Sequence, residues 1–214
     1  MATLEERLAR LEGLVVPDSF PSFGTVPVTE TFMGLHDRAH SLIYLAGVLG
    51  GGLSVAPSAS IDPVVSGRLY ALPLYISTPR RADQATFRVD TLAAGYARIG
   101  LYDVGDRVSL YPGRRLYDFG EVSTGTTGVK VITVSPVQTI PRGLSWLVIE
   151  LSNRAYLSAL PTQDQWMLLG NNPTLAVGYS GWTKSLTYGP LPEVFPSGGS
   201  LQTTMPICGL RFIE

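Results

Sequence analysis

The chain offers few side chains that could act as nucleophiles, bases or metal ligands. It contains one cysteine, Cys208, and two histidines, His36 and His40. A thiol beside an imidazole would form a nucleophile and its base. Nothing in the sequence brings Cys208 near a histidine, and Cys208 lies in an apolar run, so we expect a buried, inert thiol. The two histidines, spaced i, i+4, are too few to hold a metal. We therefore predict that the protein uses no metal and no cofactor.

Carboxylate pairs are the second source of chemistry, because many sugar-cleaving proteins use two of them. Asp103 and Asp106 flank a glycine, and so do Asp118 and Glu121. Aspartate at a hairpin corner accepts local hydrogen bonds from the backbone, and we predict that role for both pairs. A calcium site at Asp103 and Asp106 is the alternative for the first pair. The sequence also lacks a phosphate loop, a dinucleotide glycine fingerprint and a GxSxG elbow. We predict a protein that is not an enzyme.

Aromatic residues near turns are the remaining candidates for binding. Tyr111, Tyr117, Tyr179, Trp182 and Tyr188 lie in or near turns rich in glycine and proline. Such rings can stack on sugar faces or anchor protein contacts. They can equally cap the ends of a core, and the sequence leaves both roles open. We take these five as candidates for surface recognition. Trp146 lies inside an apolar run, and we predict that it belongs to the core.

Composition describes the scaffold that must position these residues. The chain has 214 residues, of which 45% are hydrophobic and 15% charged, with 23 Gly, 16 Pro and a net charge of -1. This composition predicts one main domain with a sizeable core and many turns. A net charge near zero gives no broad reason to bind nucleic acid or an anionic membrane. The uncharged stretch 41–61 is interrupted by glycines, so we predict a buried strand or short helix followed by a glycine loop, not membrane insertion.

The N-terminal segment has the pattern of a short coiled coil. Leu4, Leu8, Leu11 and Val15 are spaced 4, 3 and 4 residues apart, as in the a/d seam of a heptad. A helix of about three turns is marginal alone in water, so it must pack against copies of itself or against the body of the protein. We predict that residues 1–16 form an oligomerisation or attachment helix. A helix docked within its own chain is the alternative.

The rest of the chain has the pattern of an all-β protein. Residues 17–62 read as an extended connector with an edge strand at 25–32. Residues 63–214 alternate short β-like runs with turn signals, which favours an antiparallel β-sandwich or jelly roll. The predicted strands are 68–76, 85–92, 96–104, 129–134, 144–152, 165–170, 174–180 and 208–214, and the turn signals are at 103–106, 111–114 and 171–173.

The segment from Arg68 to Asn153 contains, in order, the pieces RLYALPLYI, ARIGLYD, YPGRRLYDFGEVSTGTTGVKVITV and IPRGLSWLVIELSN. In these pieces and their order it resembles a β-sandwich module of bacteriophage virion proteins, especially tail-fibre and minor tail proteins. The final PICGLRFIE resembles the closing strand of these proteins. An N-terminal coil such as LEERLARLE is also common in trimeric phage appendages.

The resemblance implies a structural protein of the virion, assembled in the host cytoplasm, that works as a homotrimeric tail-fibre or receptor-binding module. It implies contacts with other virion proteins through the N-terminal segment and with a glycan of the host cell surface. A head decoration or head fibre is the main alternative. A glycan depolymerase and a cellular sugar-binding lectin are two further alternatives.

Overall fold

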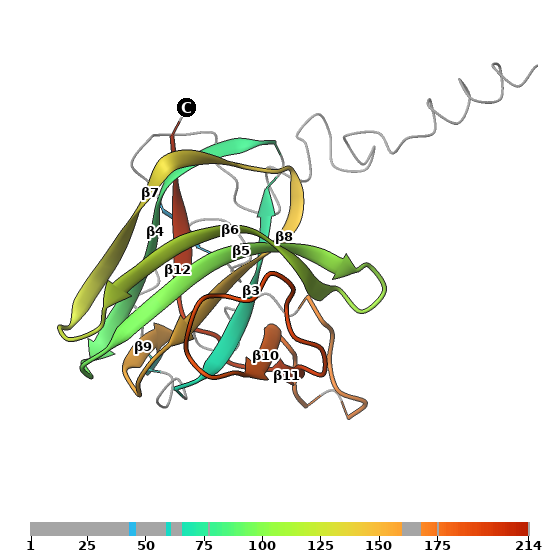
Figure 1. Cartoon of the computed structure of the whole chain (residues 1–214). Helices are drawn as coiled ribbons and strands as arrows, with labels where there is room; N and C mark the ends of the chain where they lie inside the picture. Colours follow the sequence, from blue (N-terminus) through green and yellow to red (C-terminus); the bar gives the residue numbers. More distant parts are fainter. Residues whose placement is uncertain are drawn as a thin grey trace, which may run out of the picture.

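The computed structural model describes residues 43–45, 59–60, 66–76, 78–159, 168–174 and 176–213. Within them the protein is all-β, with two antiparallel sheets and no helix (Figure 1). The first sheet has the order β1 (Ile43–Leu45), β12 (Cys208–Ile213), β4 (Arg80–Thr91), β9 (Tyr156–Ala159) and β2 (Ala59–Ser60), with β7 (Gly128–Ile140) on the other edge of β4. The second has the order β11 (Ser200–Gln202), β10 (Gly181–Ser185), β3 (Arg68–Ile76), β8 (Gly143–Leu151), β5 (Tyr96–Asp106) and β6 (Tyr111–Ser123).

The prediction of an all-β, antiparallel fold is confirmed for these residues. The run 68–76 is β3 with the predicted bounds, and the run 144–152 matches β8 within one residue at each end. The described residues contain no helix long and apolar enough to cross a membrane. The predicted coil at 1–16, the edge strand at 25–32 and both histidines lie outside the described residues.

The two sheets pack face to face around an inter-sheet core, in a sandwich-like arrangement. Because side chains alternate along a strand, Leu147, Ile149 and Leu151 of β8 face this core. Trp146 and Val148 of the same strand face the opposite side, where a second apolar cluster covers them. The strand is thus buried on both faces, as its near-continuous apolar run predicts. Cys208 is also buried in the inter-sheet core, and burial raises the pKa of its thiol.

The turns predicted at 103–106 and 111–114 are wrong. Residues 103–106 and 111–114 lie in β5 and β6, and the chain turns between them at 107–110. Gly105 and Gly113 lie at very short range across the hairpin, since a Cβ atom on Gly105 would lie 2.6 Å from the Cα of Gly113. These glycines therefore allow a close approach of two strands, which the sequence pattern does not distinguish from a turn.

The predicted strand at 174–180 is also wrong for its described residues. These residues form a compact turn in which the Asn172 side chain accepts hydrogen bonds from the amides of Ala176 (3.0 Å) and Val177 (3.2 Å). Only one isolated bridge, Asn171 to Gly178, has β geometry there. The described part of the run 165–170 is likewise a turn. The backbone amides here are thus bonded by the side chain of Asn172 and not by a neighbouring strand.

Candidate recognition site

The outer face of the second sheet is covered by a long loop that joins β10 to β11. We call this loop, residues 186–199, the strap (Figure 1, orange-red). Beneath it lies the outer cluster of buried side chains, which draws residues from β3, β5, β8 and the strap. Its members are Leu69, Ala71, Tyr102, Trp146, Val148, Leu191 and Phe195. The strap therefore buries the outer face of the second sheet, as the first sheet buries its inner face.

Backbone and side-chain hydrogen bonds hold the strap against β5 and β6. The Arg115 amide donates to the Glu193 carbonyl (2.8 Å), and the Phe195 amide donates to the Gly113 carbonyl (2.8 Å). The Tyr102 hydroxyl donates to the Pro192 carbonyl at 2.7 Å. The strap is thus hydrogen-bonded along β6, almost as an extra strand would be.

A glycine in β5 lets the strap approach the sheet. A Cβ atom on Gly100 would lie 2.5 Å from the Leu191 side chain and 2.8 Å from the Tyr117 carbonyl oxygen. Any larger residue there would displace Leu191 from the outer cluster. The glycine of the run YARIGLYDV is therefore explained by packing against the strap.

Two of the predicted recognition residues, Tyr111 and Trp182, meet under the end of the strap. Their rings pack edge to face with centroids 4.9 Å apart, and Tyr111 also packs against Phe195 at 5.5 Å. The Tyr111 hydroxyl donates to the Pro196 carbonyl (2.6 Å) and accepts from the Gly199 amide (2.8 Å). Both rings are half-buried, and Tyr111 fixes the strap in place.

Removing the Tyr111 hydroxyl is expected to destabilise the fold. Tyr111→Phe leaves a carbonyl and an amide without their partner, at a cost of about 1–3 kcal/mol. The matched control is Tyr117→Phe, because the Tyr117 hydroxyl makes a single, solvent-exposed hydrogen bond, to the Thr139 carbonyl (2.9 Å). Urea unfolding gives the free energy of unfolding of both variants and of the wild type. An equal or smaller loss for Tyr111→Phe would show that its two bonds do not hold the strap.

The other three predicted recognition residues lie apart from this pair, and all three are half-buried. The Tyr117 ring stacks on Phe119 with centroids 6.2 Å apart. Tyr179 is held by its backbone, whose amide donates to the Gly170 carbonyl at 2.9 Å. Tyr188 lies in the strap, and its hydroxyl donates to Glu121 at 2.8 Å. A role in recognition stays a prediction for all five.

The two carboxylate pairs singled out by the sequence differ in their partners: Asp103, Asp106 and Asp118 accept hydrogen bonds from backbone amides, as predicted, whereas the prediction is wrong for Glu121, which bonds the side chains of Arg98 and Tyr188. Asp103 accepts from the Arg114 amide (2.6 Å) across the hairpin, and Asp106 accepts from the Val108 amide (2.9 Å) and the Ser109 hydroxyl. The Ser109 hydroxyl is the main reason that the pKa of Asp106 is lowered. Asp118 accepts from the Gly120 amide at 3.0 Å. In the part of the chain that the structure describes, no three His, Cys, Asp or Glu side chains gather as metal ligands would.

Glu150 is the residue that sequence reasoning missed. It lies on β8 opposite Arg98 of β5 and Leu69 of β3, on the face that the strap covers, and it has no exposed surface. Burial raises the pKa of its carboxyl to about 7. The Gly189 amide, although outside hydrogen-bonding geometry, and the charge of Arg98 act in the opposite direction. A single Glu at the end of the run LSWLVIEL was the signal that could have identified it.

Arg98 links Glu150 to a charged cluster at the edge of the strap. Its guanidinium bonds Glu121 (3.0 Å) and Asp118 (3.1 Å), so its charge is already shared by two carboxylates. The Tyr188 hydroxyl is the main reason that the pKa of Glu121 is lowered, and Arg98 adds to the effect. Glu121 and Glu150 thus have pKa values displaced in opposite directions, as in an acid–base pair. Glu150 is fully covered, however, so no substrate atom can reach its carboxyl in this conformation.

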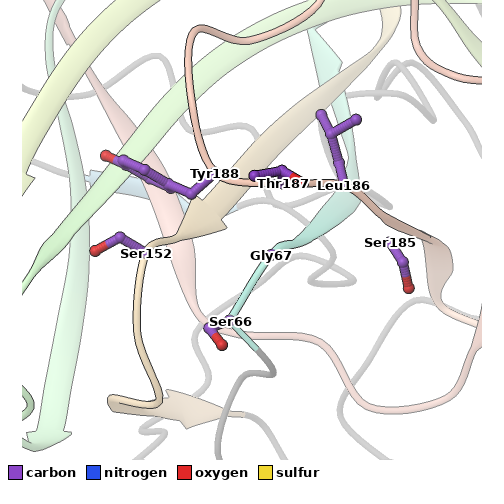
Figure 2. Close-up of a pocket in the computed structure, with 7 residues that line it drawn as sticks. All are labelled: Ser66, Gly67, Ser152, Ser185, Leu186, Thr187 and Tyr188. Carbon is purple, nitrogen blue, oxygen red and sulfur yellow. The ribbon is translucent and has the colours of Figure 1, made fainter.

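A hydroxyl-lined hollow of about 610 Å³ opens beside the strap. Its lining is Ser66, Gly67, Ser152, Ser185, Leu186, Thr187 and Tyr188. In Figure 2, Tyr188 and Ser152 lie to one side of Gly67, and Ser185 and Leu186 lie to the other. Gly67 has a positive φ of 70°, and a Cβ atom there would lie 2.6 Å from the Leu186 carbonyl oxygen. The floor of the hollow therefore requires glycine.

No family model matches the chain, and no curated protein matches it.

Proposed function

We propose that this protein is a structural component of a bacteriophage virion that works as a homotrimeric tail-fibre or receptor-binding module. In this proposal residues 1–16 join the copies and attach them to other virion proteins. Residues 17–62 form a connector that also supplies the short strands β1 and β2 to the first sheet, and residues 63–214 form the rest of a jelly-roll-like domain that binds a glycan of the host surface. The chain is not an enzyme in this proposal.

The observation that carries the adhesive role is the hollow beside the strap. It is open and lined by the hydroxyls of Ser, Thr and Tyr side chains, which can donate to and accept from the hydroxyls of a sugar. Tyr188 adds a ring that its bond to Glu121 holds in position. Fixed polar groups bind a ligand at a lower entropic cost than mobile ones.

Support for assembly comes from the edge strand β7. Val129 and Val131 are 63% and 42% exposed on its outer face, whereas Ile132 and Val134 point into the core. An edge strand with exposed valines gains free energy when another surface covers it. A trimer would also give avidity to sites that bind weakly one at a time.

The state of assembly can be measured by sedimentation equilibrium of the full chain at micromolar concentration. We expect a species of three times the chain mass of 23.0 kDa. Leu8→Glu places a charge in the predicted heptad seam and should shift the mass toward one chain, whereas Arg10→Gln on the outer face should not. A wild-type chain that sediments only as a monomer would contradict the trimer.

Labelled antibody on purified virions tests the virion role and its location. Label at the tail tip supports a receptor-binding module, and label over the capsid supports the alternative of a head decoration or head fibre. Virions that contain none of the chain would overturn both versions.

A further inference from the structure

Tyr96, the first residue of β5, presents an aromatic ring to solvent. It is 50% exposed, and no other aromatic side chain is exposed in the parts of the chain described from residue 66 onward. Tyr102, further along the same strand, is by contrast fully buried under the strap. A tyrosine ring in water offers an apolar face on which a ligand can stack.

The strand register places Tyr96 on the same face of the second sheet as the hydroxyl-lined hollow. Ala97 of β5 pairs with Leu151 of β8, and both point into the inter-sheet core. Their neighbours Tyr96 and Ser152 therefore point to the outer face, where Ser152 lines the hollow. The Ser152 amide donates to the Tyr96 carbonyl (2.9 Å), and the Tyr96 amide donates to the Ser152 hydroxyl (2.8 Å). The two residues are thus direct neighbours.

Tyr96 continues a row of residues that runs across the strands from the hollow. The Gly67 amide donates to the Leu151 carbonyl (3.1 Å), and the Leu186 amide donates to the Gly67 carbonyl (2.8 Å). The row therefore passes from Leu186 through Gly67 and Ser152 to Tyr96, and its first three members line the hollow. At a strand spacing of about 4.8 Å the row is roughly 14 Å long, which suits an oligosaccharide better than a single sugar.

A hydrogen-bonded charged pair lies beside Tyr96 on this face. Arg98 is two residues along β5, and its guanidinium bonds Glu121, its partner on β6, at 3.0 Å. Glu121 also accepts from the hydroxyl of Tyr188, whose side chain lines the hollow. The donors and acceptors next to the exposed ring are thus held in place, and such groups can bond the hydroxyls of a sugar.

The charges around this part of the sheet balance one another. Arg98 and Arg115 share the carboxylates of Asp118 and Glu121 in three ion pairs. The carboxyl of Glu150, beside Arg98, has no exposed surface, and no charged side chain lines the hollow. A charged ligand would therefore lose its hydration without gaining an unshared opposite charge, whereas a neutral ligand would not.

We propose that Tyr96 is the stacking platform of the glycan site, and that the ligand is a linear chain of neutral pyranoses with equatorial hydroxyls. One sugar lies with its C–H face on the Tyr96 ring and its hydroxyls toward Ser152 and the Arg98–Glu121 pair, and the chain continues into the hollow. Equatorial hydroxyls point sideways from the sugar ring, so that its C–H bonds can meet the aromatic face. This inference rests on the proposed adhesive function and adds the ligand class and the residue that recognises it.

Calorimetric titration of the full chain with cellotetraose tests the ligand class. The matched probe is the same tetrasaccharide with each C6 oxidised to a carboxylate, which keeps the ring hydroxyls and adds charge. We expect cellotetraose to bind at least about three-fold more tightly than the acid, with an affinity that salt does not change. Cellobiose should bind about ten-fold more weakly than cellotetraose, because it is too short to reach from Tyr96 through the hollow.

Substitutions at Tyr96 test the platform. Tyr96→Ala removes the stacked surface and should weaken binding of cellotetraose by about ten-fold. Tyr96→Phe keeps the ring and should bind within about three-fold of the wild type. Val108→Ala is the matched control, because Val108 is 95% exposed in the turn at the other end of β5, and it should bind as the wild type does. Thermal unfolding of each variant shows that the fold is retained.

The outcomes separate this proposal from the proposed function. Tighter binding of the acid, no binding of cellotetraose at millimolar concentration, or a Tyr96→Ala variant no weaker than Val108→Ala would overturn the Tyr96 site, while antibody labelling of virions still decides the virion role. Equal affinities for cellobiose and cellotetraose would overturn the extension into the hollow. A chain that binds cellotetraose through Tyr96 but is absent from virions would overturn the virion role and leave the site.

Discussion

The Glu150→Gln variant is expected to gain about 2–3 kcal/mol of stability relative to the wild type when the pH is raised from about 5 to about 8. The buried Glu150 carboxyl has a pKa of about 7 in the folded chain, against 4.5 for the free group. Between these values the folded state binds more protons than the unfolded state, so the wild-type chain loses stability as the pH rises. The loss is complete above about pH 7 and absent well below pH 4.5. Glutamine cannot ionise, so the Glu150→Gln variant does not lose this stability as the pH rises.

Urea unfolding of both proteins at the two pH values gives this difference directly. A buried glutamine amide without partners adds the same cost at both pH values, so the change with pH is the diagnostic quantity. Carboxyls whose pKa is lowered, such as Asp83 beside Arg211, respond in the opposite direction but equally in both proteins. Glu193→Gln, on the exposed side of the strap, is the matched control and should alter stability by less than about 0.5 kcal/mol. Parallel pH profiles for Glu150→Gln and the wild type would contradict the buried, neutral carboxyl.

The second large effect is expected for Trp146→Ala, at about 3–5 kcal/mol of lost stability. Trp146 is 0% exposed and is the largest side chain of the outer cluster. Its loss opens a cavity between β8 and the strap that the surrounding side chains can fill only in part. Since the whole stability of a domain is about 5–15 kcal/mol, the variant should be close to its folding limit at room temperature. Trp146→Phe keeps a ring and should lose much less.

Proteolysis tests whether this loss acts through the strap. Glu193 is exposed, so a glutamate-specific protease should cleave there once the strap lifts. Leu147→Ala, one residue further along β8, creates a comparable cavity on the inter-sheet side. At matched global stability, Trp146→Ala should speed cleavage at Glu193 more than Leu147→Ala does. Equal rates would show that the strap opens only with the whole domain.

The strands with clear alternation or apolar runs, β3, β4, β5, β7, β8 and β12, were predicted, because these patterns reflect burial in the core of the sandwich. The long strand β6 was not, because its first residues, YPGR, have the composition of a turn. β3 and β8 have strong apolar runs and were placed within a residue. β10 was not predicted, because the sequence GWTKS has no alternating apolar pattern and pairs with β3 through its backbone. A short strand whose neighbours are far away in sequence leaves little local signal.

The strap and the site beneath it could not be predicted for a similar reason. Residues 186–199 read as a turn-rich loop, and only their contacts with β5 and β6 reveal a covering layer. Tyr111 and Trp182 were singled out by composition alone, and their contact depends on pairing between distant strands. Glu150 looked like the polar end of a strand, and its burial follows from the strap above it.

The proposed function requires that copies of this chain assemble on a virion surface and adhere through the sandwich domain. A density map of the purified particle, with this chain fitted into it, tests the claim most directly. We expect sandwich domains in groups of three at an external appendage, joined at their N-termini, with the hollow beside the strap open to solvent. Single copies inside the particle, or groups that bury this hollow against another virion protein, would contradict the proposed function.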